Sequence, residues 1–329
     1  MDLVINTWGS FIKKKDNCFL IKNKEGTSEI SAEKVNTILI TNSAGISSDA
    51  VELALSKNID IVFLDKFGNP YGRVWHSKFG STNLIRRIQI EAGRNKIGLN
   101  LSKDWVNTKI GNQIGFIKEL KKNRPEMKEF FDDGISYMQQ FPAKVDDLSG
   151  SPDQIRGSIM GYEGSCSKKY FEMLSAVMPE RWTFSGRSRN PAKDEFNCLL
   201  NYGYGMLYSL TEKACIIAGL DPYAGFLHVD NYNKMSFVFD IIEIFRIYID
   251  VPVVHLFTKK MVHEDYFDEI PGGYYLNAEG KKAMVSAINQ SLESDIPYQG
   301  RNVMKKNVIQ MECHRVANHL LKFENEVLK

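Results

Sequence analysis

Three short stretches of the chain carry side chains suited to holding a divalent metal ion. Glu163 lies in the run Gly-Tyr-Glu-Gly, His228 ends the run Gly-Phe-Leu-His, and Asp240 and Glu243 share one apolar segment. A carboxylate inside an apolar segment is costly to bury unless a cation meets it. Because one metal ion could satisfy all of these groups, the pattern predicts a single site that draws them together.

The segment 236–249 places three charges on one helical face. Asp240, Glu243 and Arg246 are spaced by three residues among mostly apolar neighbours. A helix that is apolar nearly all round is buried, so this polar stripe must meet polar groups or a ligand inside the fold. An internal salt bridge from Arg246 to Glu243 or to Asp250 satisfies the pattern as well as a metal ion does.

Glycines surround Glu163, and a turning loop precedes His228. A glycine inside a helix costs about 1 kcal/mol relative to alanine, so Gly157, Gly161 and Gly164 predict close packing against a site or a neighbouring helix. Helix packing alone, with Glu163 exposed, is the alternative. His228 follows a loop with two glycines and one proline, just ahead of the buried segment.

The kinds of ligand indicate which metal the site would take. One imidazole with two carboxylates favours Mn²⁺ or Mg²⁺ over a structural zinc ion, because oxygen-rich sites prefer hard cations. Such sites also leave coordination positions for water and phosphate. A site of this composition would therefore be catalytic.

Basic residues gather in particular parts of the chain. Residues 86–125 contain ten lysines and arginines against three acids, whereas the following 55 residues contain five against ten. This segregation predicts a strip for a polyanion beside an acidic pocket, although solvated helix faces give the same pattern. Arg187 and Arg189 then precede a helix that Asn190 is expected to cap and Pro191 to begin, where both arginines could hold phosphates.

The elements that must position these residues change in character near residues 80–85. Before that point, short β-branched and aromatic runs between turn signals predict strands, with one helix capped by Ser47 or Ser48. Afterwards, apolar residues recur at helical spacing. We therefore expect an α+β fold, with a small β-rich N-terminal domain over 1–82 and a larger all-α catalytic domain over 83–329. The expected strands are 3–7, 18–22, 35–41, 59–64 and 71–75, and the expected helices are 83–98, 102–122, 125–140, 152–176, 191–218, 234–249, 278–293 and 300–325.

Composition excludes several classes of protein. The 329 residues are 43% apolar and 25% charged, which is typical of a folded protein with room for two cores. The five cysteines are odd in number and never two residues apart, which argues against a disulfide framework or a zinc ribbon. The N-terminus lacks an export signal and charges interrupt the longest apolar run, so we expect a cytoplasmic protein without a membrane span.

Taken in order, these motifs resemble the CRISPR-associated integrase family, the universal CRISPR-associated protein one. No single motif would suffice, but several in the right order extend over nearly the whole chain. The matching runs are Lys109-Ile110-x-Asn112-Gln113, Tyr162-Glu163-Gly164, Arg187-x-Arg189-x-Pro191-x-x-Asp194-x-x-Asn197, Gly219-Leu220-Asp221-Pro222, Gly225-x-Leu227-His228 and Asp240-x-x-Glu243-x-x-Arg246.

The resemblance implies a metal-dependent DNA endonuclease and integrase that inserts new spacers into a CRISPR array in antiviral defence. A 3′-hydroxyl of the incoming DNA would attack a phosphodiester. Glu163, His228 and Glu243 match the family's ligands for Mg²⁺ or Mn²⁺, and Asp240 matches a supporting acid one turn earlier. Family members often carry aspartate at the third ligand position, so the choice between Asp240 and Glu243 stays open.

The resemblance also implies binding partners. These are double-stranded DNA, as incoming fragment and CRISPR repeat, a second copy of the chain joined through the β-rich domain, and a small CRISPR-associated protein that bridges two dimers. A nuclease that only hydrolyses DNA and a non-catalytic DNA-binding scaffold with salt-bridged acids are the alternatives. The candidate DNA contacts are Arg86, Arg87, Lys109, Arg187, Arg189 and Lys193.

Overall fold

The chain folds into two compact units. The computed structural model describes residues 2–35, 37–57, 59–65, 70–74, 82–228 and 234–324. The first unit comprises Met1–Lys78, Arg189–Ser209 and His263–Gln290, and the second comprises Phe79–Ser188, Leu210–Val262 and Ser291–Lys329. Two later segments are thus grouped with the N-terminal residues, and the domain boundary after residue 82 stays a prediction.

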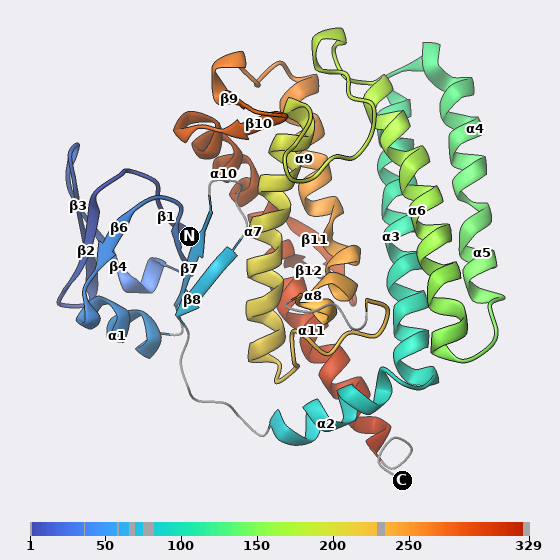
Figure 1. Ribbon diagram of the computed structural model, residues 1–329, viewed down its shortest axis with the longest axis horizontal. Helices are drawn as coiled ribbons and strands as arrows, with labels where there is room; N and C mark the ends of the chain where they lie inside the picture. Colours follow the sequence, from blue (N-terminus) through green and yellow to red (C-terminus); the bar gives the residue numbers. More distant parts are fainter. Residues whose placement is uncertain are drawn as a thin grey trace. The chain divides into compact units, whose positions relative to one another are not determined.

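Two four-stranded sheets form the N-terminal part of the first unit (Figure 1). One has the order β1 (Asp2–Ile5), β5 (Thr37–Ile40), β7 (Asp60–Leu64) and β8 (Pro70–Val74), with only β8 antiparallel to its neighbour. The other has the order β4 (Gly26–Ser31), β3 (Cys18–Asn23), β2 (Ser10–Lys15) and β6 (Ala44–Ile46). Helix α1 (Ser48–Ser56) begins where the Ser47 hydroxyl accepts a hydrogen bond from the Ala50 N–H. Residues from both sheets and from α1 join one apolar core.

All five expected strands are present, but β2, β4 and β6 were not predicted. Strand β2 buries only Ser10 and Ile12 and ends in three lysines, so it lacks a full apolar face. Strand β4 has no buried residue, and β6 is three residues long. Strands of this kind are paired by their neighbours and carry little alternation of their own.

The second unit is mainly helical. In it, α3 packs against α4, α5, α6 and the 3₁₀ turn η4, and Figure 1 shows these four helices side by side. Its helices are α2 (Thr82–Ala92), α3 (Lys96–Lys122), α4 (Lys128–Met138), α5 (Gln140–Asp146), α6 (Pro152–Ala176), α8 (Ser236–Ile241), α9 (Ile247–Thr258) and α11 (Lys305–Lys322). The residues of α7 (Glu195–Ile217) and α10 (Ala278–Glu293) are divided between the two units. The 3₁₀ turns are η1 (Ala32–Lys34), η2 (Pro125–Met127), η3 (Glu180–Trp182), η4 (Ile242–Phe245) and η5 (Glu264–Tyr266).

The two longest helices begin at well-formed caps. The Asn95 side chain accepts a hydrogen bond from the Ile97 N–H at the start of α3, at 2.8 Å. Helix α6 begins with a capping box formed by Ser151 and Gln154, and Pro152 occupies its first turn. These caps fix where each helix starts, and therefore which residues face the interior.

The β-rich start followed by a helical body confirms the predicted fold class, but the second part is not entirely helical. It contains two antiparallel hairpins, β9 (Phe267–Ile270) with β10 (Gly273–Leu276) and β11 (Asp295–Tyr298) with β12 (Arg301–Met304). Gln299 and Gly300 both have positive φ, which is the signature of a two-residue hairpin turn. The last helix therefore begins at Lys305 rather than near residue 300. Within the described ranges, no helix is both long enough and apolar enough to cross a membrane.

Candidate active site

The three predicted metal ligands and the supporting acid Asp240 lie on four separate elements of the second unit. Glu163 comes from the middle of α6, His228 ends the loop after α7, Asp240 lies on α8 and Glu243 lies in η4. The segment expected as one helix over 234–249 is divided into α8, η4 and α9. This local 3₁₀ geometry turns the backbone at Glu243, as is common near functional positions.

Lys109 from α3 lies between the carboxylates of Glu163 and Glu243. Its ammonium nitrogen contacts Glu163 Oε1 and lies 2.5 Å from Glu243 Oε2. Lys109 is 7% exposed and Glu243 is 8% exposed, so this contact is largely removed from solvent. The opposite oxygen of Glu243 lies 2.8 Å from the Arg246 guanidinium, so of the two salt bridges considered for Arg246 the one to Glu243 is present.

Burial and charge act in opposite directions on these groups. Burial alone would raise the pKa of Glu243, but the positive charges of Arg246 and Lys109 lower that pKa to about 2. Burial would likewise lower the pKa of Lys109, whereas the Glu243 and Glu163 carboxylates raise it. We therefore infer that Glu243 and Lys109 are both charged near neutral pH.

Asp240 has a different role from that of Glu243. Its Oδ2 accepts hydrogen bonds from the N–H groups of Phe226 and Leu227, at 2.6 and 2.9 Å. Its Oδ1 accepts from the His228 N–H at 3.0 Å and lies 2.7 Å from His228 Nδ1. A carboxylate has about four acceptor positions, so these four contacts use the whole capacity of Asp240.

The contact with Asp240 fixes the orientation of the His228 ring. When Nδ1 is protonated and donates a hydrogen bond to Asp240, the lone pair of Nε2 is available to a ligand. The hydrogen bond that His228 donates to Asp240 raises the pKa of His228, against the opposing effect of burial. The backbone and the ring are held by the same carboxylate, so His228 cannot turn without breaking several hydrogen bonds.

Two further buried side chains hold the loop that carries His228. Arg156 Nε donates to the Phe226 carbonyl at 2.8 Å, and Gln89 Nε2 donates to the carbonyls of Asp221 and Ala224 at 2.9 and 3.0 Å. Arg156 is 9% exposed and Gln89 is fully buried. Neither residue stands out in the sequence, because the groups they bind are backbone carbonyls far away in the sequence.

The site therefore has a closed half and an open half. Around His228, a side chain at Gly225 would place its Cβ 2.6 Å from the His228 carbonyl oxygen and 2.9 Å from the Ser236 carbonyl carbon. Around Glu163, by contrast, a Cβ added at Gly157, Gly161 or Gly164 would meet no atom within 4 Å outside its own surroundings in the helix. Among the described residues, the glycines do not pack against a neighbouring helix, because their face of α6 is exposed, and approach of a substrate to this face stays a prediction.

The role of Lys109 also differs from the expected one. The sequence predicts a DNA contact at Lys109, but the Lys109 ammonium faces Glu163 and Glu243 inside the second unit. The signal was in the sequence, because Trp105, Val106, Ile110 and Gln113 mark the buried face of α3 and Lys109 shares that face. A lysine on a buried face requires an anionic partner.

The other candidate DNA contacts lie on several elements. Arg86 and Arg87 are on α2, and Arg87 is exposed. Arg187 lies 5.5 Å from the ring centre of Phe171 and donates to the Ser188 carbonyl. Arg189 and Lys193 are both exposed and belong to the first unit, where the Lys193 ammonium donates to the Gly272 carbonyl at 2.9 Å.

The helix after Arg189 begins later than expected. Ala192 pairs with Tyr274 of β10, and the Tyr274 N–H donates to its carbonyl at 2.9 Å. Because this pairing holds the backbone extended, α7 begins only at Glu195. Asp194 then caps it by accepting from the Asn197 N–H at 2.7 Å.

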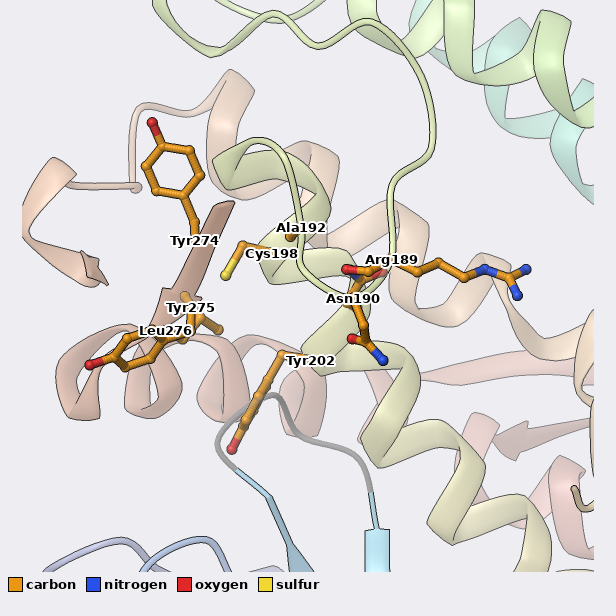
Figure 2. A pocket seen from close by; sticks show the side chains of 9 residues that line it. Arg189, Asn190, Ala192, Cys198, Tyr202, Tyr274, Tyr275 and Leu276 are labelled. Atoms are coloured by element: carbon orange, nitrogen blue, oxygen red, sulfur yellow. The ribbon is translucent and has the colours of Figure 1, made fainter. Parts of the chain in front are cut away.

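A small pocket in the first unit adjoins this segment (Figure 2). Its volume of about 10 Å³ is close to that of one water site, so it is too small for a nucleotide. Figure 2 shows the Arg189 side chain extending away from Tyr274 and Tyr275. We therefore interpret the pocket as a packing gap. It is lined by Arg189, Asn190, Ala192, Cys198, Asn201, Tyr202, Tyr274, Tyr275 and Leu276.

The donor chemistry around Glu163 and Glu243 suits a hard cation, because two carboxylates from different elements converge on one positive charge. In the part of the chain that the structure describes, no group of three or more His, Cys, Asp or Glu side chains is arranged to hold a metal ion as it stands. A metal would therefore have to replace the ammonium of Lys109 between these carboxylates.

The chain is similar to known proteins over most of its length. The family model described as CRISPR associated protein Cas1 matches residues 3–290. An Archaeoglobus fulgidus relative, described as CRISPR-associated endonuclease Cas1 1, is 32% identical over 336 residues, which cover 97% of this chain and 96% of the relative.

Two solved structures share the fold. A Cas1 protein from Thermotoga maritima has a TM-score of 0.81 at 24% identity, covering 98% of this chain and 97% of that one. A casposase bound to its integration product has a TM-score of 0.84 at 23% identity, covering 98% of this chain and 90% of that one.

Proposed function

This chain belongs to the Cas1 family of CRISPR-associated proteins, and on that premise we propose that it is a DNA endonuclease and integrase that inserts spacers into a CRISPR array. The relative that shares 32% of its residues over nearly the full length is described as an endonuclease. The proposed reaction is phosphodiester exchange, in which a DNA 3′-hydroxyl attacks a phosphate and displaces another 3′-oxygen.

We propose that Glu163, His228 and Glu243 hold Mg²⁺ or Mn²⁺. The single observation that carries this assignment is the convergence of two carboxylates on one cation position. Asp240 is not proposed as a ligand, because both of its oxygens are already used by the loop and by the ring of His228. When bound, such an ion polarises the scissile phosphate and stabilises the charge that develops on it.

Other residues of the chain orient the proposed ligands and leave room for the substrate. Asp240 directs the Nε2 lone pair of His228, and Arg246 holds one oxygen of Glu243. The exposed glycine face of α6 leaves the helix backbone beside Glu163 open to a large substrate. A DNA backbone could approach closely there, because no side chain covers it.

We base our proposals for DNA binding and for the assembly of several protein chains on membership of the Cas1 family. We propose that Arg86, Arg87, Arg187, Arg189 and Lys193 contact phosphates, which fixes the register of the DNA without reading its sequence. Structures titled as complexes with Cas2 are among the structural neighbours. We propose a homodimer that a small partner of that kind bridges to a second dimer, working in the cytoplasm where the array would be found.

A non-catalytic scaffold is the second candidate. The ion pairs from Lys109 to Glu163 and Glu243, with Arg246 beside them, already balance the buried acids without a metal. In that reading the acids stabilise the fold, and the chain binds DNA without reacting with it.

A strand-transfer assay with Mg²⁺ or Mn²⁺ and the small partner protein separates these functions. Wild type should join a labelled duplex fragment to an array, whereas Glu163→Gln and His228→Ala should lose joining by at least about 100-fold, as is typical when a group acting on the transition state is removed. Glu172→Gln is the matched control, because Glu172 is an exposed acid on the same helix.

DNA binding is measured for each variant in parallel, so that lost joining is not confused with lost binding. Joining that persists in both site variants would exclude the metal-site assignment. Cleavage without joining in wild type would indicate a nuclease that only hydrolyses DNA. Binding without either reaction would support the scaffold.

A further inference from the structure

The ammonium of Lys109 connects three elements of the second unit at one point. Lys109 belongs to α3, Glu163 to α6 and Glu243 to η4, and the lysine nitrogen contacts a carboxylate oxygen of each acid. The ammonium donates a hydrogen bond to Glu163 and forms an ion pair with Glu243. Lys109 is therefore the internal partner of both acids.

Without a cation between them, the two acids would repel each other. Both oxygens that face Lys109 lie within direct contact of one nitrogen, so they must be close together. Two carboxylates that share a site cannot both stay ionised without a compensating charge. Arg246 compensates part of the charge of Glu243 from its other side, whereas the contacts of Glu163 are Lys109 and the Ser167 hydroxyl, which donates at 2.7 Å.

We propose that Lys109 is a built-in counter-cation of the metal site, which keeps Glu163 and Glu243 converged until a divalent ion displaces its ammonium. This inference rests on the proposed metal-dependent function. A metal ion and the ammonium require the same oxygens, so they exclude each other there. The long, flexible lysine side chain allows its head group to leave while its stem stays packed.

The consequence is a weak affinity of the free protein for metal. Metal binding must break two charge-assisted contacts of Lys109 as well as form the new bonds. Lysine displacement is favoured when another anion receives the ammonium, and a DNA phosphate is such an anion. Metal binding and DNA binding should therefore favour each other.

Isothermal titration of metal-free, full-length protein with Mn²⁺, without DNA, tests the proposal. Lys109→Met replaces the lysine by an uncharged side chain of similar length, and it should lower the Kd for Mn²⁺ by about tenfold, within the usual range of coupling between competing ligands. Lys109→Gln provides a second uncharged variant in case the methionine variant folds poorly. Lys109→Arg keeps the charge and should bind Mn²⁺ no more tightly than wild type.

Two controls identify the site of binding. Lys118→Met removes an exposed lysine from the same helix and should leave the Kd unchanged. Glu163→Gln and Glu243→Gln should weaken Mn²⁺ binding in the wild-type background. Unfolding temperature without metal is recorded for every variant, and added Mn²⁺ should raise it more for Lys109→Met than for wild type.

The outcomes distinguish this proposal from the function on which it rests. An unchanged or weaker Kd in both uncharged variants, while wild type binds Mn²⁺ through Glu163, would overturn the counter-cation role alone. Absence of Mn²⁺ binding in wild type and in all Lys109 variants would overturn the metal site itself. Equal tightening by Lys118→Met would show a general effect of net charge and would also overturn the proposal.

Discussion

The two halves of the candidate site are held together by different kinds of contact. In the half around His228, Asp240 binds three backbone N–H groups, and the loop has no room for a side chain at Gly225. In the half around Glu163, side-chain cations hold the acids, and the adjoining helix face is open. The first half is built into the backbone, whereas the second can exchange its cation without refolding.

The strongest test of the backbone-held half is Asp240→Ala. It would leave three buried N–H groups and the His228 ring without their acceptor, so we expect a loss of about 4 kcal/mol in the free energy of unfolding. Urea denaturation followed by circular dichroism measures it. Asp221→Asn, in the exposed turn where Asp221 accepts from the Tyr223 N–H, should cost less than about 1 kcal/mol. Equal small losses in both variants would show that the closed half is not held by Asp240.

In the half of the site that includes Glu163 and Glu243, the contribution to stability should depend on pH. Because the pKa of Glu243 in the folded protein is about 2, below its ordinary value of 4.5, its contribution is fully present above pH 4.5 and is lost as the pH falls towards 2. The stability difference between wild type and Glu243→Gln should therefore shrink by about 3 kcal/mol over that range. Denaturation series at several pH values, in buffer with a chelator, measure it. A difference that stays constant with pH would contradict the ionic account.

Because the loop before His228 is tightly packed, Gly225→Ala should lower the free energy of unfolding. The new Cβ would overlap backbone atoms of His228 and Ser236, which cannot move away as a flexible side chain would. We expect a loss of about 2 kcal/mol, typical of overpacking. Gly111→Ala on α3 is the matched control, since its Cβ would meet nothing within 4 Å. If the control is equally destabilised, space around Gly225 is not the cause.

The smallest change in stability is expected in the open half around Glu163, where a substitution should stabilise the protein. Gly161→Ala adds a Cβ in open space on a helix, so it should raise the free energy of unfolding by about 1 kcal/mol. The same variant should reduce strand transfer several-fold if DNA lies against this face. Ser158→Ala, an exposed small residue on the same helix, should leave strand transfer unchanged. Full activity in Gly161→Ala would indicate that the substrate approaches from elsewhere.

The sequence predicted the elements better than the contacts between them. Helical spacing located α3 and α6, and Ser47 was correctly named as a possible cap of α1. The spacing of Glu243 and Arg246 made their salt bridge one of the possible contacts, because residues three apart on a helix are neighbours. Local periodicity contains this kind of information.

The rest depended on contacts over long distances in the sequence. Whether Asp240 or Glu243 faced a cation could not be decided from spacing, since the answer depends on which loop N–H groups reach Asp240. The glycines of α6 predicted packing against a site or a neighbouring helix, but no helix among the described residues covers that face. The hairpin turn at Gln299 and Gly300 interrupted an otherwise helical pattern, because two positive φ angles end a helix whatever its periodicity.

The meeting of α3, α6 and η4 at Lys109 also bears on when the site can form. Lys109 and Glu163 are 54 residues apart, and Asn112, whose side chain donates to the Ile244 carbonyl at 3.0 Å, is 132 residues from its partner. Contacts of such high sequence separation close late in folding, because the intervening chain must first lose its conformational freedom. A chain still emerging from the ribosome lacks Glu243 until well after Lys109 and Glu163 have been synthesised. The proposed metal site would thus form only once this part of the helical unit is complete.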